Sequence, residues 1–196
     1  MNEDELIYRL KYGGGSKQPI AKAIKVSNKV HLKVIDATAG LGTDSIVLAS
    51  LNCQIYAIEK NLTVAELLQK RLDKAKNNDF LAPIVKNITL IIGDSRIIIP
   101  DIIKTKQYIP DVIYLDPMFP PKKKTSAPNK QIQILQAIIA NSETNTETND
   151  LLKICLNYAK QRIVVKRPRL AANLENIKPH FSLIGRSNRF DVYLPK

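Results

Sequence analysis

Short apolar segments alternate with longer amphipathic segments along this chain, and the alternation restricts the possible folds more than any other feature. Strands separated by helices predict a parallel sheet that is covered by helices. The short apolar segments, read as strands, are residues 33–37, 54–58, 88–92, 111–115 and 162–166. The segments with helical spacing are residues 44–51, 61–76, 131–140 and 151–161.

The C-terminal part follows another pattern. Residues 181–184 and 189–194 are two extended runs around the turn-forming residues 185–188, which predicts an antiparallel hairpin. Five β-α units closed by such a hairpin are typical of the Rossmann-like fold of class I S-adenosylmethionine methyltransferases. We therefore expect an α/β fold with a mostly parallel sheet. We also expect one methyltransferase domain over residues 31–196, preceded by an N-terminal lead with a glycine-rich segment over residues 1–30.

The chain is strongly basic. Its 30 Lys and Arg residues against 18 Asp and Glu residues give a formal net charge of +12. An excess of this size indicates an anionic partner such as nucleic acid, although a generically basic protein remains the alternative. Hydrophobic residues make up 44% of the chain, which is normal for a folded protein and too high for a disordered one.

Targeting signals and metal ligands are not evident. No apolar run reaches the roughly 18 residues of a membrane-spanning helix, and the acidic N-terminus does not resemble a signal peptide, so we expect a cytoplasmic protein. Cys53 and Cys155 lie in separate apolar segments, which favours core positions over a disulfide. His31 and His180 are isolated, so no metal site is expected.

The ends of the predicted strands carry the most informative residues. Ligands of open α/β sheets bind beyond the carboxyl ends of the strands. Four acidic residues stand at these positions: Asp36, Glu59, Asp94 and Asp116. The four acids together indicate a ligand site more specifically than any one of them does.

The first strand-to-helix turn contains Gly40 and Gly42, which would let the backbone approach a ligand closely. It does not match the dinucleotide fingerprint, because Ser45 stands where the third glycine would be. Asp44 suits a cationic or hydroxyl-bearing ligand instead of a pyrophosphate, although it could simply begin the helix.

The next two strand ends predict contacts to a nucleoside. Glu59 is placed to accept hydrogen bonds from ribose hydroxyls, with Lys60 beside it. Asp94 and Ser95 can hold an adenine amino group. A solvated carboxylate at Glu59 and an ordinary turn at Asp94 are the alternatives.

The fourth strand ends in Asp116-Pro117-Met118-Phe119-Pro120-Pro121, which resembles the [DN]-P-P-[YF] signature of amino-group methyltransferases. Asp116 and the backbone carbonyl beside Pro117 could accept the two N–H bonds of a base amine and orient its nitrogen. Phe119 could stack on the base. A proline-rich turn is the alternative.

Two basic stretches flank this motif, over residues 121–130 and 166–169. Both would leave the same edge of the sheet, where they could hold phosphates around a presented base. Solvated lysine runs are the alternative.

Four blocks together resemble the RsmJ-type ribosomal RNA small-subunit methyltransferases: DATAGLGTDSIVLASLNC, YLDPMFPPKKK, RIVVKRP and RFDVY. The resemblance implies S-adenosylmethionine as cofactor, N2-methylguanosine as product, and small-subunit ribosomal RNA or the 30S particle as substrate. It places cofactor contacts on Thr43, Asp44, Glu59, Lys60, Asp94, Ser95 and Asp116. The family usually carries Arg at the positions of Thr43 and Lys60.

Other functions remain open from sequence alone. The same chemistry could act on DNA adenine or a protein glutamine, although those enzymes prefer Asn in place of Asp116. A non-catalytic RNA-binding protein could keep the fold. An NAD-dependent oxidoreductase is disfavoured, because the third glycine and a catalytic His or Tyr-Lys pair are missing. The oligomeric state is not indicated.

Overall fold

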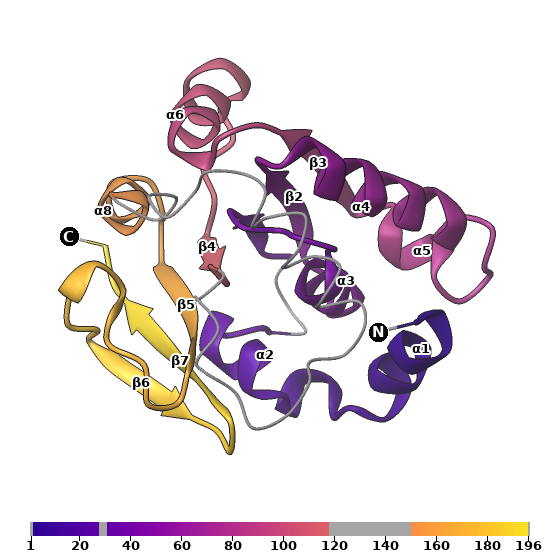
Figure 1. The fold of residues 1–196 in the computed structure, drawn as a ribbon, viewed down its shortest axis with the longest axis horizontal. Coiled ribbons are helices and arrows are strands. Elements are labelled where there is room, and N and C mark those ends of the chain that lie inside the picture. Colours follow the sequence, from indigo (N-terminus) through magenta and orange to yellow (C-terminus); the bar gives the residue numbers. More distant parts are fainter. Residues whose placement is uncertain (1, 28–30, 118–149, 196) are drawn as a thin grey trace.

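A computed structural model describes residues 2–27, 31–117 and 150–195. Its centre is a seven-stranded sheet in the order β3-β2-β1-β4-β5-β7-β6 (Figure 1). The strands are β1 (Lys33–Asp36), β2 (Gln54–Glu59), β3 (Ile88–Ile92), β4 (Val112–Leu115), β5 (Arg162–Pro168), β6 (Phe181–Ile184) and β7 (Asn188–Tyr193).

Strands β1 to β5 pair parallel with one another, and β7 pairs antiparallel with both β5 and β6. The sheet is therefore mostly parallel and closes with a C-terminal hairpin, which confirms the predicted fold class. The chain order reverses between β1 and β4. A ligand site is expected beyond the carboxyl ends of these central strands.

Helices cover both faces of the sheet (Figure 1). One hydrophobic cluster joins one face to α1, α2, α3, α4 and α5, and a second joins the other face to α6 and α8. The helices are α1 (Glu3–Tyr12), α2 (Pro19–Ile24), α3 (Thr43–Ser50), α4 (Leu62–Ala75), α5 (Ala82–Val85), α6 (Ser95–Lys106) and α8 (Leu151–Leu156), with short 3-10 turns at Gly15–Lys17 and Leu174–Asn176. No helix in these described ranges is long and apolar enough to cross a membrane.

Alternation along the strands decides which side chains face which helices. In β1, Val34 packs in the cluster with α3, and Ile35 packs in the cluster with α6. Successive strand residues point to opposite faces, so Asp36 follows Val34 toward α3. The same rule places Tyr114 and Lys166 on the α3 face, at the carboxyl end of the sheet.

Helix α6 was missed by the sequence analysis. Its first turn holds three consecutive isoleucines, residues 97–99, and Pro100 follows them, features that lower helix propensity. Asp94 nevertheless caps the helix by accepting a hydrogen bond from the backbone N–H of Arg96 at 3.0 Å, and Ile99 and Ile102 are buried in the core. Tertiary packing thus outweighs the weak local preference.

Other helix predictions need revision or lie outside the described residues. The helix predicted over residues 151–161 ends at Leu156. The helix predicted over 131–140 lies outside the described residues. In the N-terminal lead, Leu6 and Ile20 are buried in the same cluster as the sheet. The domain boundary at residue 30 stays a prediction.

Candidate cofactor and substrate site

The glycine turn after β1 presents its backbone to open space at one position. Gly40 has a φ of +55°, and no atom lies within 4 Å of where a Cβ would stand. Gly42 has a φ of +70°, but a Cβ there would meet Leu68 Cδ1 of α4 at 2.4 Å. The prediction of two ligand-facing glycines is therefore wrong for Gly42, which packs against α4.

Asp36 stabilises this turn through hydrogen bonds. It is 2% exposed and accepts hydrogen bonds from Ser45 Oγ at 2.5 Å and from the backbone N–H of Thr38 at 3.3 Å. Burial raises the pKa of Asp36 to about 7. Because its carboxylate is enclosed, Asp36 holds the start of α3 against β1 and has no open side for a ligand.

Glu59 ends β2 beside the open face of Gly40. Its carboxylate accepts the backbone N–H of Gly40 at 2.8 Å and the backbone N–H of Asn61 at 2.8 Å. Asn61 in turn caps α4 by accepting a hydrogen bond from the backbone N–H of Val64 at 3.1 Å. Glu59 thus ties two loops together at the strand ends, and its half-buried carboxylate lies where a ribose contact is predicted.

The carboxylate of Asp94, which follows β3, has more charged partners than that of Glu59. Arg96 donates from Nε to Asp94 Oδ1 at 3.0 Å and from Nη2 to Asp94 Oδ2 at 2.5 Å, and these bonds lower the pKa of Asp94. Lys60 Nζ lies 3.8 Å from Asp94 Oδ2. Ser95 is buried and donates its hydroxyl to the carbonyl of Ala37 at 2.6 Å, so its side chain faces the core.

Thr43 begins α3 and receives a side chain from α4. Arg71 Nη1 donates to Thr43 Oγ1 at 3.1 Å and to the carbonyl of Leu41 at 2.8 Å. A guanidinium therefore reaches this position from α4, although residue 43 itself is not arginine. Sequence reasoning missed Arg71, which lies 28 residues away along the chain.

The site's main electrostatic feature is a lysine between two carboxylates. Lys166 Nζ lies 2.7 Å from Asp44 Oδ2 and 2.7 Å from Asp116 Oδ2. Asp44 also accepts from the Tyr114 hydroxyl at 2.7 Å and from Arg9 Nη2 at 3.2 Å. These contacts join the start of α3 to the ends of β4 and β5.

The contacts of Lys166 with Asp44 and Asp116 influence the protonation state of all three groups. Burial by itself would raise the pKa of Asp44, but the charge and hydrogen bonds of Lys166 outweigh it and hold the pKa below its usual range. At Asp116, enclosure raises the pKa and Lys166 only partly opposes this. Burial lowers the pKa of Lys166, but the two carboxylates outweigh it and raise the pKa overall. Lys166 therefore stays protonated.

The basic stretch over residues 166–169, predicted to hold phosphates, has two of its side chains engaged within the protein. Lys166 is paired with carboxylates, and Arg167 is buried at 6% exposure and donates to the carbonyl of Ala172. Arg169 is exposed at the end of the stretch. The other basic stretch, residues 121–130, lies outside the described residues.

The motif after β4 is described as far as Pro117. The backbone N–H of Asp116 donates to Thr38 Oγ1 at 2.7 Å, so the turn after β1 fixes the start of the motif. Pro117 is buried, whereas 38% of the Asp116 side chain remains exposed. Phe119, the predicted stacking residue, lies outside the described residues.

Along the strand ends, the Glu59 carboxylate after β2 comes first, the open backbone of Gly40 after β1 follows, and the exposed part of Asp116 after β4 comes last. This order fits an elongated ligand with a hydroxyl-bearing ribose and a cationic centre. No cluster of three or more candidate metal ligands occurs in the parts of the chain that the structure describes.

Sequence reasoning placed the strand-end acids correctly but missed their partners. The sequence predicts that Tyr114 lies within a strand and that Lys166 belongs to a stretch that holds phosphates. A signal was present for Lys166, because a lysine two residues after the buried Val164 must share its face. Arg9 gave no signal, since its partner Asp44 lies 35 residues away.

Comparison with protein families gives a match over nearly the whole chain. The family described as "Putative SAM-dependent methyltransferase" matches residues 1–195. The ribosomal RNA small subunit methyltransferase J of Colwellia psychrerythraea is 42% identical over 192 residues, which cover 98% of this chain and 68% of that protein. The protein of the same name from Nitrosococcus oceani is 40% identical over 189 residues, covering 95% of this chain and 72% of that protein.

Solved structures agree with this match. The SAM-dependent methyltransferase NGO1261 from Neisseria gonorrhoeae superposes with a TM-score of 0.73 at 36% identity, covering 91% of this chain and 71% of that one. An RNA methyltransferase from Salinibacter ruber, in complex with S-adenosyl-L-homocysteine, has a TM-score of 0.54 at 10% identity, covering 100% of this chain and 92% of that one. The second likeness concerns the fold alone.

Proposed function

This chain belongs to the ribosomal RNA small subunit methyltransferase J family of SAM-dependent methyltransferases, and we propose that it methylates the N2 amino group of a guanine in small-subunit ribosomal RNA. The enzyme class and the cofactor, S-adenosylmethionine, follow from family membership. The guanine position rests on the resemblance of the motif that begins at Asp116. The observation that carries the proposal is the half-open Asp116 carboxylate at the end of β4, held by Lys166 at 2.7 Å.

The residues present fit this cofactor. Gly40 exposes its backbone to open space, and Glu59 places a carboxylate beside it, bonded to the Gly40 N–H at 2.8 Å. We propose that Glu59 accepts hydrogen bonds from the ribose hydroxyls and that the turn at Thr43 and Asp44 faces the methionine part. Lys60, Asp94 and Ser95 would flank the adenine, with Ser95 contributing backbone because its hydroxyl is engaged with Ala37.

When bound, the cofactor supplies a methyl group activated by a positively charged sulfonium. The task of the chain is to make a poor nucleophile react, because the lone pair of an exocyclic amine is drawn into the base ring. Asp116 would accept one N–H of the amine, and the carbonyl beside Pro117 the other, which orients the nitrogen lone pair toward the methyl carbon. The amine would give up one proton as it takes the methyl group from the sulfonium, and Asp116 is the nearest proposed acceptor of that proton.

Lys166 would keep Asp116 ionised for this role. Enclosure raises the pKa of Asp116, and a protonated carboxyl group would lose one acceptor oxygen. The ammonium group of Lys166 opposes that change from 2.7 Å. Asp44, on the other side of Lys166, gives this cation a second fixed partner, so Lys166 does not depend on Asp116 alone.

The test is methyl transfer from labelled S-adenosylmethionine to 30S particles and to naked small-subunit RNA, followed by nucleoside analysis. We expect N2-methylguanosine in at least one of the two substrates, in keeping with a cytoplasmic enzyme that acts on ribosomes. Label on protein glutamine in the particles, or on adenine of DNA offered as a separate acceptor, would instead support the alternatives left open by the motif. If no acceptor is labelled while the cofactor binds, the proposal of a catalytic RNA methyltransferase is refuted.

Substitution of Glu59 with Ala is expected to weaken cofactor binding about 10- to 100-fold, because hydrogen bonds to a charged group contribute about 1.5–3 kcal/mol. Isothermal titration with S-adenosylhomocysteine measures the effect. The matched control is Glu66→Ala, an exposed carboxylate on α4, which should leave binding unchanged. Equal affinities of the two variants would remove Glu59 from the cofactor site.

A further inference from the structure

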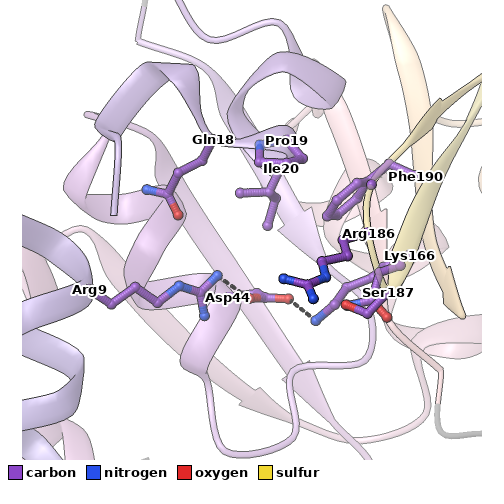
Figure 2. Close-up of a pocket in the computed structure, with 11 residues that line it drawn as sticks. Arg9, Gln18, Pro19, Ile20, Asp44, Lys166, Arg186, Ser187 and Phe190 are labelled. Atoms are coloured by element: carbon purple, nitrogen blue, oxygen red, sulfur yellow. Dashed lines mark hydrogen bonds and ion pairs between the residues drawn. The ribbon is translucent and has the colours of Figure 1, made fainter. Parts of the chain in front are cut away.

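A cavity lies on the α3 face of the sheet, beside Lys166 and the carboxylate of Asp44. Its volume is 340 Å³, and it is lined by residues of α1, α3, β5 and β7, of the start of α2, and of the turn between β6 and β7. Figure 2 shows Arg9 entering from one side and Arg186 and Lys166 from the other, around Asp44. The cavity is thus formed by segments that are far apart in the sequence.

The cavity wall is positively charged. It contains three cations, Arg9, Lys166 and Arg186, and one carboxylate, Asp44. Asp44 is already engaged by Arg9 and Lys166. Arg186 is exposed and forms no hydrogen bond or ion pair with the residues that the structure describes. The surplus charge predicts an anionic ligand.

The cavity adjoins the predicted site of reaction. Lys166 lines the cavity and also contacts Asp116. Phe190 lies opposite Lys166 in the register of β5 and β7 and lines the same cavity. The cavity is therefore adjacent to the position where a base would be presented to Asp116, within reach of the backbone of the same RNA strand.

A further basic residue stands near the outer rim. The backbone N–H of Arg169 donates to the carbonyl of Ser187 at 3.0 Å, next to Arg186 in the turn. Arg169 is exposed. Positive charge therefore continues from the cavity along the β6–β7 turn, as expected for a surface that follows a phosphate backbone.

We propose that this cavity binds a backbone phosphate of the RNA beside the target nucleotide, with Arg186 as the principal contact and Arg9 as the second. A guanidinium pairs with phosphate through two parallel hydrogen bonds, which suits an arginine without a partner among the described residues. The assignment rests on the proposed function, because it presumes an RNA substrate. The carboxylate of a bound cofactor has similar chemistry, so the test separates the two.

The experiment compares Arg186→Gln with Lys104→Gln, which removes the same charge from an exposed position on α6, the helix on the opposite face of the sheet. Binding of naked small-subunit RNA is measured by fluorescence anisotropy between about 50 and 200 mM salt. We expect Arg186→Gln to weaken binding about tenfold at low salt and to lower the salt slope by about 0.7, the loss of one single-strand phosphate contact. Lys104→Gln should resemble the unchanged protein, and Arg186→Lys should recover part of the affinity.

Three results would overturn the assignment. In the first, Arg186→Gln matches Lys104→Gln in both RNA affinity and salt slope, while the unchanged protein methylates RNA normally. The assignment of a phosphate site to this cavity would then be refuted, and the proposed function would stand. A loss of S-adenosylhomocysteine affinity in Arg186→Gln, with RNA binding intact, would assign the cavity to the cofactor. If the unchanged protein neither binds nor methylates RNA, both proposals fail. Thermal melts of each variant verify that the fold is retained.

Discussion

Replacing Asp116 with Ala is expected to abolish measurable turnover, a loss of at least about 10²–10³-fold in kcat, the usual effect of deleting one preorganised group that stabilises the reacting centre. The carboxylate is the acceptor that orients the substrate amine in the proposed mechanism. Its backbone N–H bond to Thr38 at 2.7 Å does not involve the side chain, so the turn should survive. Lys166 keeps its bond to Asp44, which limits the structural damage.

Two further variants make this prediction specific. Asp116→Asn keeps one acceptor oxygen and should retain more activity than Asp116→Ala. Asp101→Ala removes an exposed carboxylate from α6 and should behave as the unchanged protein. The measurements are single-turnover methyl transfer, S-adenosylhomocysteine binding and thermal melting. Normal turnover by Asp116→Ala, or its failure to fold, would contradict the assigned role.

Replacing Lys166 with Met should have the largest effect on stability. Breaking a buried ion pair by removing one partner typically costs about 3–5 kcal/mol, because the remaining charge is left without compensation. Lys166 is 23% exposed on its side chain and Asp44 is 10% exposed, so we expect about 3 kcal/mol, at the low end of that range. Urea unfolding measures the loss, with Lys104→Met as an exposed lysine control.

The loss of unfolding free energy in Lys166→Met should depend on pH. In the unchanged protein the pKa of Asp44 is lowered, so its stabilising effect is present above the ordinary Asp pKa of about 4 and disappears as pH falls through the lowered value. Without Lys166, only Tyr114 and Arg9 oppose the effect of burial, so we expect the pKa of Asp44 to rise. The free-energy difference between Lys166→Met and the unchanged protein should therefore be largest near pH 7.5 and smaller near pH 4.5.

The catalytic consequence follows from the same charge. Removal of Lys166 should raise the pKa of Asp116 further, since Lys166 now opposes the effect of enclosure. The acid limb of kcat against pH should then move to higher pH, and Lys166→Arg should reverse much of the shift. A uniform loss of activity at every pH, with no movement of the limb, would show that Lys166 is only structural.

Much of the fold was predictable because it depends on local pattern. Apolar runs at residues 33–37 and 54–58 became β1 and β2 with ends shifted by at most one residue, and the C-terminal hairpin formed where its turn residues stand. The strand-end rule then brought Glu59 and Asp116 to one edge of the sheet. Helix α6 was not predictable in this way, because its isoleucines and Pro100 favour other local structure and only burial in the core outweighs them.

The sequence by itself thus determined the parallel sheet, its closing hairpin and the line of acidic residues along the strand ends, since periodicity and turn chemistry act between near neighbours. Only the tertiary structure decided which acids remain open to a ligand. Asp36 became enclosed under Ser45, and Lys166 moved from a predicted phosphate ligand to a bridge between Asp44 and Asp116. These partners stand 122 and 50 residues from Lys166 along the chain, so their contact depends on strand order and register, which no local pattern specifies.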